Sequence, residues 1–93
     1  MIIGSAILSV RIIGAQSLKE KRGILLSMIR RTRNKYNVAI AEVGSQNLWQ
    51  RADIGIAVIS STVKHAEIQL QNIVRFIETE PRLEIVSLET EIL

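Results

Sequence analysis

Two segments with the periodicity of a helix, residues 17–37 and 62–79, are interspersed with segments that alternate like strands. The strands are expected over residues 2–13, 38–43, 52–60 and 83–92. In a chain of 93 residues, the order β-α-β-β-α-β predicts a ferredoxin-like α/β (α+β) sandwich. A four-stranded antiparallel sheet would carry both helices on one face, and residues 1–93 would form a single domain.

Apolar side chains define an inner face on each element. On the first and third strands the expected core residues are Ala6, Leu8, Val10, Ile12, Ile54, Ile56 and Val58. On the first helix, a step of about 100° per residue places Leu18, Leu25, Ile29 and Tyr36 in one stripe. On the second helix, the stripe consists of Val63, Ala66, Leu70, Ile73, Val74 and Ile77. Pro81 is expected to end that helix.

Other apolar residues are expected at the surface. The outer face of the first strand carries Ile3, Ser5, Ile7, Ser9, Arg11 and Ile13. A sheet that exposes isoleucine at this density often packs against a second copy or another partner, and we predict a homodimer. Ile68 and Phe76 lie outside the main stripe of the second helix, and either bind a partner or widen the core.

The first helix has the strongest local signals. Ser17 is a suitable N-cap, and Glu20 follows three residues later, which is the spacing of a capping box. The segment carries seven basic residues and one acid. They lie on two flanks of the apolar stripe. One flank holds Lys19, Arg22, Arg30 and Arg33 within about 80°, and the other holds Lys21, Arg31 and Lys35.

The first of these flanks has two interpretations. Four cations along one ridge suit a phosphate backbone, because each would replace condensed counterions. Alternatively, the long side chains cover the rim of the core while their charged groups stay in water. Residues 1–51 carry a net charge of +7 and residues 52–93 a net charge of −4. This polarity suits either an anionic partner or neutralisation within the fold or across a dimer.

The loop before the third strand contains the only tryptophan. Trp49, Gln50 and Arg51 are candidate nucleic-acid contacts, although Trp49 could instead cover the end of the core. No aromatic residue lies on the two central strands, which disfavours the stacking of RNA bases on the sheet. Any RNA contact is therefore expected to be to the backbone or to the shape of a duplex.

Few residues suggest catalysis. Glu42 and Asp53 flank the loop, and we expect ion pairs with Arg11 or Arg51 rather than acid–base chemistry. A lone histidine, His65, and the absence of cysteine predict no metal, no cofactor and no disulfide. The chain is not expected to be an enzyme. No apolar run approaches the roughly 20 residues of a membrane-spanning helix, so we expect a protein without membrane contact. The absence of cysteine fits a reducing, cytoplasmic setting.

The segments SLKEKR at residues 17–22 and VAIAEVGSQNLWQRADIG at residues 38–55 resemble the YlxP-like family of small bacterial proteins of unknown function. The resemblance covers nearly the whole chain, and implies the ferredoxin-like sandwich and a cytoplasmic location. Genes of this family often lie near genes for translation initiation and ribosome maturation, which implies an RNA- or ribosome-associated role. Family members often carry Asp where this chain has Asn47, and the resemblance implies no catalytic residues.

The leading hypothesis is a non-enzymatic, dimeric binding module that contacts structured RNA or a ribosomal particle. The expected contacts are Lys19, Arg22, Arg30, Arg33, Trp49, Gln50 and Arg51. The alternative is a protein-interaction or homo-oligomerisation module with no nucleic-acid role. A small-ligand or enzymatic domain is a third hypothesis, which rests on fold analogy alone.

Overall fold

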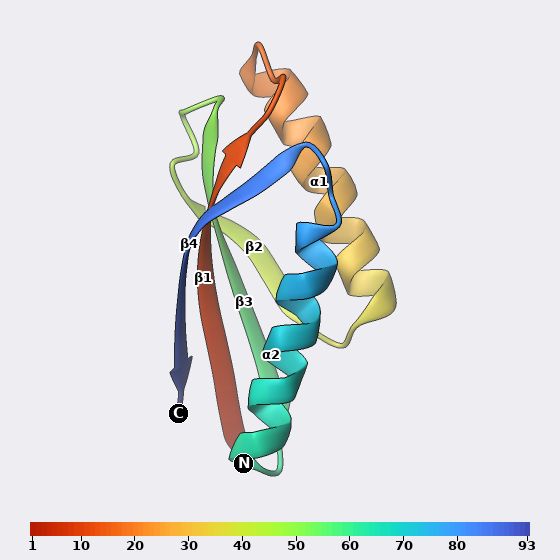
Figure 1. The fold of residues 1–93 in the computed structure, drawn as a ribbon, viewed down its shortest axis with the longest axis vertical. Coiled ribbons are helices and arrows are strands. Elements are labelled where there is room, and N and C mark those ends of the chain that lie inside the picture. The colour runs from red at the N-terminus through yellow and green to blue at the C-terminus, as the bar shows by residue number, and fades with distance from the viewer.

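The computed structural model describes residues 1–93 as β1 (Ile2–Ile12), α1 (Leu18–Lys35), β2 (Ala39–Gly44), β3 (Arg51–Ser60), α2 (Val63–Glu78) and β4 (Leu83–Ile92). The strands form one antiparallel sheet in the order β2-β3-β1-β4. Both helices lie on the same face of this sheet (Figure 1). The predicted ferredoxin-like α+β sandwich is confirmed. Each strand begins and ends within one residue of its expected position.

The core lies between the sheet and the two helices. All the core residues expected from β1 and β3 are buried, because alternate side chains of a strand point to the same face. From α2 the core receives Ala66, Leu70, Ile73, Val74 and Ile77. Val63 is exposed, which corrects the expected stripe. It is the first residue of α2, and helical side chains point toward the N-terminus, so Val63 extends beyond the end of the helix.

The inner face of α1 differs from the expected stripe. Its buried residues are Lys21, Leu25, Met28 and Thr32, whereas Leu18, Ile29 and Tyr36 are only partly buried. The buried face is rotated from the apolar stripe by about 50°. The two polar residues on this face have partners. The Thr32 hydroxyl donates to the Met28 carbonyl oxygen at 2.8 Å, and the partners of Lys21 are described below.

Side-chain caps begin both helices. The Ser17 hydroxyl accepts a hydrogen bond from the Glu20 backbone N–H at 3.1 Å, as predicted. The Glu20 carboxylate accepts from the Gln16 N–H at 2.8 Å, one residue before the N-cap. At α2, the Thr62 hydroxyl accepts from the His65 N–H at 3.1 Å. These contacts satisfy backbone donors that have no partner within a helix.

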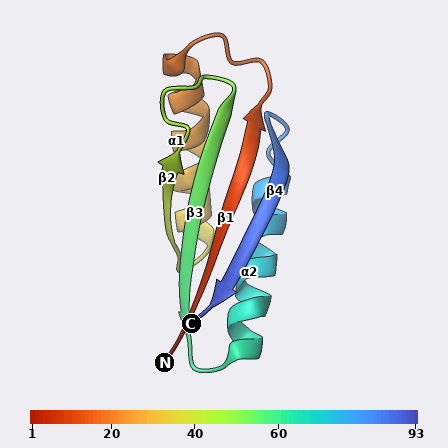
Figure 2. The same ribbon diagram turned by 90° about the vertical axis from the view of Figure 1, so that its left-hand side faces the viewer.

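The sheet face opposite the helices is open (Figure 2). Ile7, in the central strand β1, is 47% exposed there. Small residues surround it on β2 and β3, because Ile7 pairs with Gly55 and Gly55 pairs with Ala41. A Cβ added at Gly55 would lie 3.1 Å from Val43, so a glycine lets Val43 lie flat over the sheet. The result is a shallow apolar hollow of about 530 Å³ on this open face.

Candidate functional site

The predicted basic flank of α1 lies at the surface. Lys19, Arg22, Arg30 and Arg33 are all exposed, and we call this set the basic ridge. The first three make no ion pair, because no carboxylate of the chain lies within 4.0 Å of them. The guanidinium of Arg33 donates to the Ile40 carbonyl oxygen of β2 at 3.0 Å, which places this ridge beside the β2 edge of the sheet.

Lys21 is not a surface cation, contrary to the prediction that placed it on the second flank. Its side chain is 0% exposed, because it lies one turn before Leu25 on the buried face of α1. Its Nζ donates to the carbonyl oxygens of Ser45 at 2.8 Å and Leu48 at 2.5 Å. The Glu42 carboxylate lies 2.8 Å from the same Nζ. Lys21 therefore fastens the β2–β3 loop to α1.

The rest of the second flank is also engaged within the molecule. Arg31 forms an ion pair of 2.6 Å with the buried carboxylate of Glu80. The Nζ of Lys35 lies 4.9 Å from the ring centroid of Phe76, a cation–π contact. Phe76 packs edge-on against Tyr36 with centroids 5.6 Å apart, and Tyr36 in turn packs against the core. On the opposite flank, Lys19, Arg22 and Arg30 of the basic ridge have neither a carboxylate nor an aromatic ring as partner.

Glu80 joins α1 to the turn between α2 and β4. Besides Arg31, it accepts hydrogen bonds from the Arg82 side chain, the shortest at 2.7 Å, and from the Arg82 backbone N–H at 3.1 Å. The Arg82 side chain is the main reason that the pKa of Glu80 falls from 4.5 to about 2. The Arg82 backbone N–H and Arg31 lower it further, and together they outweigh the effect of burial. No sequence pattern indicated this cluster.

The three candidate residues at the end of the β2–β3 loop and the start of β3 lie in two environments. Trp49 is 40% exposed in the loop that Lys21 fastens. The Gln50 carbonyl oxygen accepts from the Ile12 N–H at 2.8 Å, while its side chain is exposed. Arg51 pairs across the strands with Arg11 on the open face. Arg51 and the basic ridge therefore lie on opposite sides of the sheet, so a ligand that contacts both must wrap around the β2 edge.

Glu42 and Asp53 do not meet, and the expected ion pairs with arginine are wrong. Glu42 pairs in register with Ile54 and points under α1, toward Lys21. Asp53 points to the open face and accepts hydrogen bonds from the hydroxyls of Ser9 at 2.7 Å and Ser45 at 3.2 Å. Glu42 points to the same face as its partner Ile54, whereas Asp53, the residue before Ile54, points to the opposite face. The two carboxylates are therefore on different sides of the sheet.

Arg11 forms its ion pair with Glu84 of β4 instead, at 3.1 Å between exposed side chains. The two residues are cross-strand neighbours on β1 and β4. The ferredoxin-like topology places β1 beside β4. A bulge after Ser9 shifts the pairing of the two strands by one residue, and this shift places Arg11 opposite Glu84. The sequence offered no signal for that bulge.

Comparison with known proteins agrees with the motifs noted in the sequence. A family described as "Protein of unknown function (DUF503)" matches residues 3–90. The chain belongs to this family. It is also 43% identical over 89 residues to the "Uncharacterized protein YlxP" of Bacillus subtilis (strain 168), covering 96% of this chain and 97% of that protein. The predicted family is thus confirmed.

Among solved structures, the fold is similar to the de novo designed protein Foldit4. The TM-score is 0.56 at 10% sequence identity, and the match covers 100% of this chain and 97% of that chain. At this identity the likeness concerns the fold alone.

The arrangement of side chains bears on what the molecule can bind. No group of three or more His, Cys, Asp or Glu side chains converges on one point. Neither helix has the length and apolarity that crossing a bilayer requires. The basic ridge is a set of exposed cations on one helix that have no carboxylate partners within the protein.

Proposed function

We propose that this protein is a cytoplasmic, non-enzymatic binding module that contacts structured RNA, free or in a ribosomal particle, through the basic ridge. One observation carries the proposal: Lys19, Arg22 and Arg30 form no ion pair, whereas Lys21, Arg31 and Lys35 of the same helix are engaged within the fold. Cations left unpaired along one line are available to replace the counterions of a phosphate backbone.

The dimensions of the ridge suit an extended polyanion. Lys19 and Arg33 are 14 residues apart on a continuous helix, which at 1.5 Å per residue is about 21 Å. A duplex presents several phosphates over that length. The open sheet face carries no aromatic side chain on its central strands, so recognition would rest on the backbone and on shape rather than on stacked bases.

A binding role is also supported by the carboxylates near the loop. Glu42 is held by Lys21, and Asp53 is held by two hydroxyls. Carboxylates that already have intramolecular partners are less available as general acids or bases. Trp49 and Gln50 would add contacts from the fastened loop, and Arg51 would add one only to a ligand that wraps around the β2 edge.

The proposal is tested by measuring affinity against salt concentration, with a labelled RNA hairpin and purified ribosomal RNA as probes. We expect the triple variant Lys19→Gln, Arg22→Gln, Arg30→Gln to lose at least about tenfold in affinity at low salt. The slope of log K against log salt should shrink by about 2 to 3, one unit for each lost phosphate contact.

The matched control is Lys35→Gln, Lys64→Gln, Arg75→Gln, which lowers the net charge by the same amount but leaves the ridge intact. Its affinity should stay within about threefold of the unaltered protein. Equal losses in the two triple variants would reduce the interaction to net charge and overturn a site on the ridge. Absence of measurable binding by the unaltered protein would overturn the proposed function.

A specific observation also favours a second function, homodimerisation through the open face. Ile7 and Val43 line the apolar hollow there, and Ile59 is exposed on the same face, opposite Ile3. Contiguous exposed apolar surface on a small protein is typical of interaction sites. The two proposed surfaces adjoin at the β2 edge of the sheet, because Arg33 of the basic ridge also lines the apolar hollow.

A further inference from the structure

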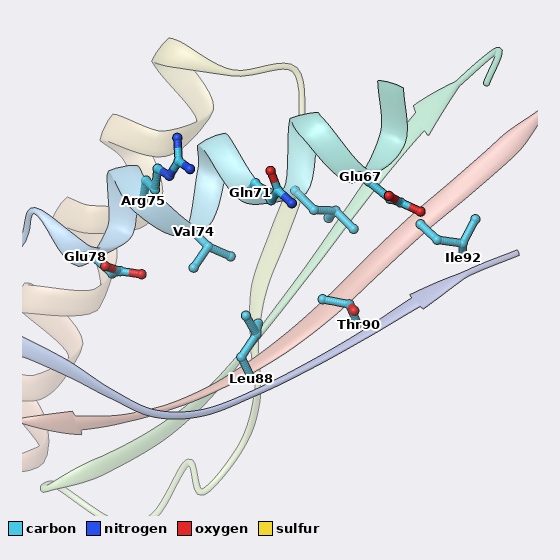
Figure 3. A pocket seen from close by; sticks show the side chains of 9 residues that line it. Glu67, Gln71, Val74, Arg75, Glu78, Leu88, Thr90 and Ile92 are labelled. Carbon is cyan, nitrogen blue, oxygen red and sulfur yellow. The ribbon is translucent and has the colours of Figure 1, made fainter. Parts of the chain in front are cut away.

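A groove separates α2 from the edge strand β4 (Figure 3). Its volume is about 390 Å³. In Figure 3, Leu88 and Ile92 point from β4 toward α2, and Val74 points back toward β4. Leu88 is 45% exposed although it lies on the helix-facing side of the sheet, opposite the buried Leu8. The helices therefore leave an apolar part of the core layer uncovered at this edge.

The backbone of β4 is also unpaired on its outer side, because β4 is the last strand of the sheet. Ile3 and Leu93 exchange two hydrogen bonds, of 3.0 and 2.7 Å. In an antiparallel ladder, such pairs alternate with pairs whose N–H and C=O groups point away from each other. The backbone groups of Leu88, Thr90 and Ile92 consequently point outward, and the side chains of these same residues line the groove.

The charge around this edge is negative. Glu89 and Glu91 lie on the open-face side of β4, opposite Ile7 and Ser5, and neither forms an ion pair. Glu67 and Glu78 of α2 line the groove from the other side. Arg75 is the one cation among the lining residues, and its side chain turns away from β4 (Figure 3).

We propose that β4 accepts an extended peptide segment of another protein as a fifth strand, with alternating apolar and basic residues. Main-chain hydrogen bonds would form with Leu88 and Thr90. Because paired residues point to the same face, the peptide residues opposite Leu88 and Thr90 would place apolar side chains in the groove. The alternate residues would place Lys or Arg opposite Glu89 and Glu91, on the other face.

The acidic edge argues against two other occupants. Antiparallel pairing of β4 with β4 of a second copy would bring Glu89 and Glu91 of both copies close together on one face, where like charges destabilise the pair. Nucleic acid would meet the same carboxylates and be repelled. A basic, alternating peptide is the occupant whose charge and periodicity complement both sides of the edge.

The first experiment uses fluorescence anisotropy with a labelled peptide of alternating Lys and Val. Two controls are a peptide of the same composition in blocked order, and a peptide of alternating Glu and Val. We expect the Lys-Val peptide to bind at least about tenfold more tightly than either control. The amide NMR shifts that change should be those of Leu88–Ile92 and of the facing turns of α2. Shifts confined to other surfaces would overturn the proposal.

Charge is tested with the double variant Glu89→Gln, Glu91→Gln. We expect at least about a fivefold loss of affinity. The double variant Ser61→Lys, Asn72→Lys raises the net charge by the same two units at exposed positions outside the groove, and should weaken binding by less than about twofold. Equal weakening by the two variants would mean that the peptide responds only to net charge.

Strand addition is tested with Thr90→Pro, which removes an outward N–H without removing a bond to β1. We expect this variant to lose peptide binding while its amide spectrum stays folded. If the variant does not fold, a Lys-Val peptide N-methylated on the residues that face β4 tests the same bonds in the unaltered protein. Unchanged affinity of the methylated peptide would overturn strand addition. Binding by RNA with shifts at β4 would likewise contradict the proposal.

Discussion

Lys21 has more influence on the candidate site than any other single residue. Its ammonium group binds two loop carbonyls and one carboxylate, all within 2.8 Å, in a fully buried position. This cluster stabilises the fold only while the ammonium group is present, because removing it would leave buried acceptors without a hydrogen-bond donor.

We therefore expect Lys21→Met to lower the free energy of unfolding by about 2–4 kcal/mol. The substitution keeps the apolar stem but leaves Glu42 and two carbonyls without their donor. Chemical denaturation measures the loss. Trp49, the only tryptophan, should become easier to quench with acrylamide in the folded variant, because its loop is no longer fastened.

Two controls separate the loop contact from general effects. Glu42→Gln should cost less than Lys21→Met, because the ammonium keeps its two carbonyl acceptors. Arg22→Gln, at the adjacent exposed position, should change stability by less than about 0.5 kcal/mol. A Lys21→Met variant as stable as the unaltered protein would contradict the assigned role.

Glu80 links stability to pH. Its pKa in the folded protein is about 2, below the ordinary value of 4.5. The carboxylate therefore stabilises the fold above about pH 5, and this contribution is lost as the pH falls through about 2. Its upper limit is about 3 kcal/mol, and the true value is smaller because solvent screens the half-exposed arginines.

We expect Glu80→Gln to lower stability at pH 7 and to flatten the dependence of stability on pH between about 5 and 2. Thermal unfolding followed across that range measures both effects. Glu84→Gln, which removes an exposed ion pair with Arg11, should cost less than about 1 kcal/mol at pH 7. If the stability of the Glu80→Gln variant fell with pH between about 5 and 2 as steeply as that of the unaltered protein, Glu80 would not hold the turn to α1.

At the scale of elements, two glycines in and before α1 differ in backbone conformation: Gly14 needs a positive φ, and Gly23 does not. A Cβ added at Gly23 or Gly14 would meet no atom within 4 Å. Gly23 lies within α1, where alanine has a higher helix propensity. Gly14 has φ +84°, in the left-handed region that L side chains rarely adopt.

We expect Gly23→Ala to stabilise the protein by about 0.5–1 kcal/mol, since it removes backbone freedom from the unfolded chain without strain. Gly14→Ala should destabilise it by about 1 kcal/mol or more, because the new side chain opposes the turn into α1. Denaturation midpoints measure the difference. The same sign for both substitutions would contradict the backbone geometry of one of the two sites.

At the scale of the whole molecule, the open face leaves Ile7 and Val43 exposed beside an apolar hollow of about 530 Å³. If two copies pack through it, sedimentation velocity should show a dimer at micromolar concentration. We expect Ile7→Lys, at the centre of this face, to raise the dimer dissociation constant at least about tenfold.

Ile68→Lys is the matched control, because Ile68 on α2 is similarly exposed, at 44% against 47% for Ile7. It should leave the dissociation constant unchanged if the sheet is the interface. A stronger effect of Ile68→Lys than of Ile7→Lys would assign dimerisation to the second helix. A monomer at all accessible concentrations would remove this function.

The periodicity of single elements predicted most of the fold. Alternation in β1 and β3 placed every expected core residue of these strands correctly, because a strand face is set by the parity of the sequence position. The choice of which face of α1 is buried was predicted less well. Lys21 counts as polar in any hydrophobic pattern, and its burial depends on acceptors from β2 and the following loop, which lie 21 or more residues further along the chain.

By itself, then, the sequence determined the order of elements, the sandwich, the family and the exposed basic ridge, since each depends on local periodicity, caps and motifs. Tertiary structure alone decided which charges are free. It buried Lys21, paired Arg31 with Glu80, separated Glu42 from Asp53, and left an acidic, unpaired edge at β4. These outcomes depend on contacts between distant segments, and no local pattern encodes a partner that only folding brings near.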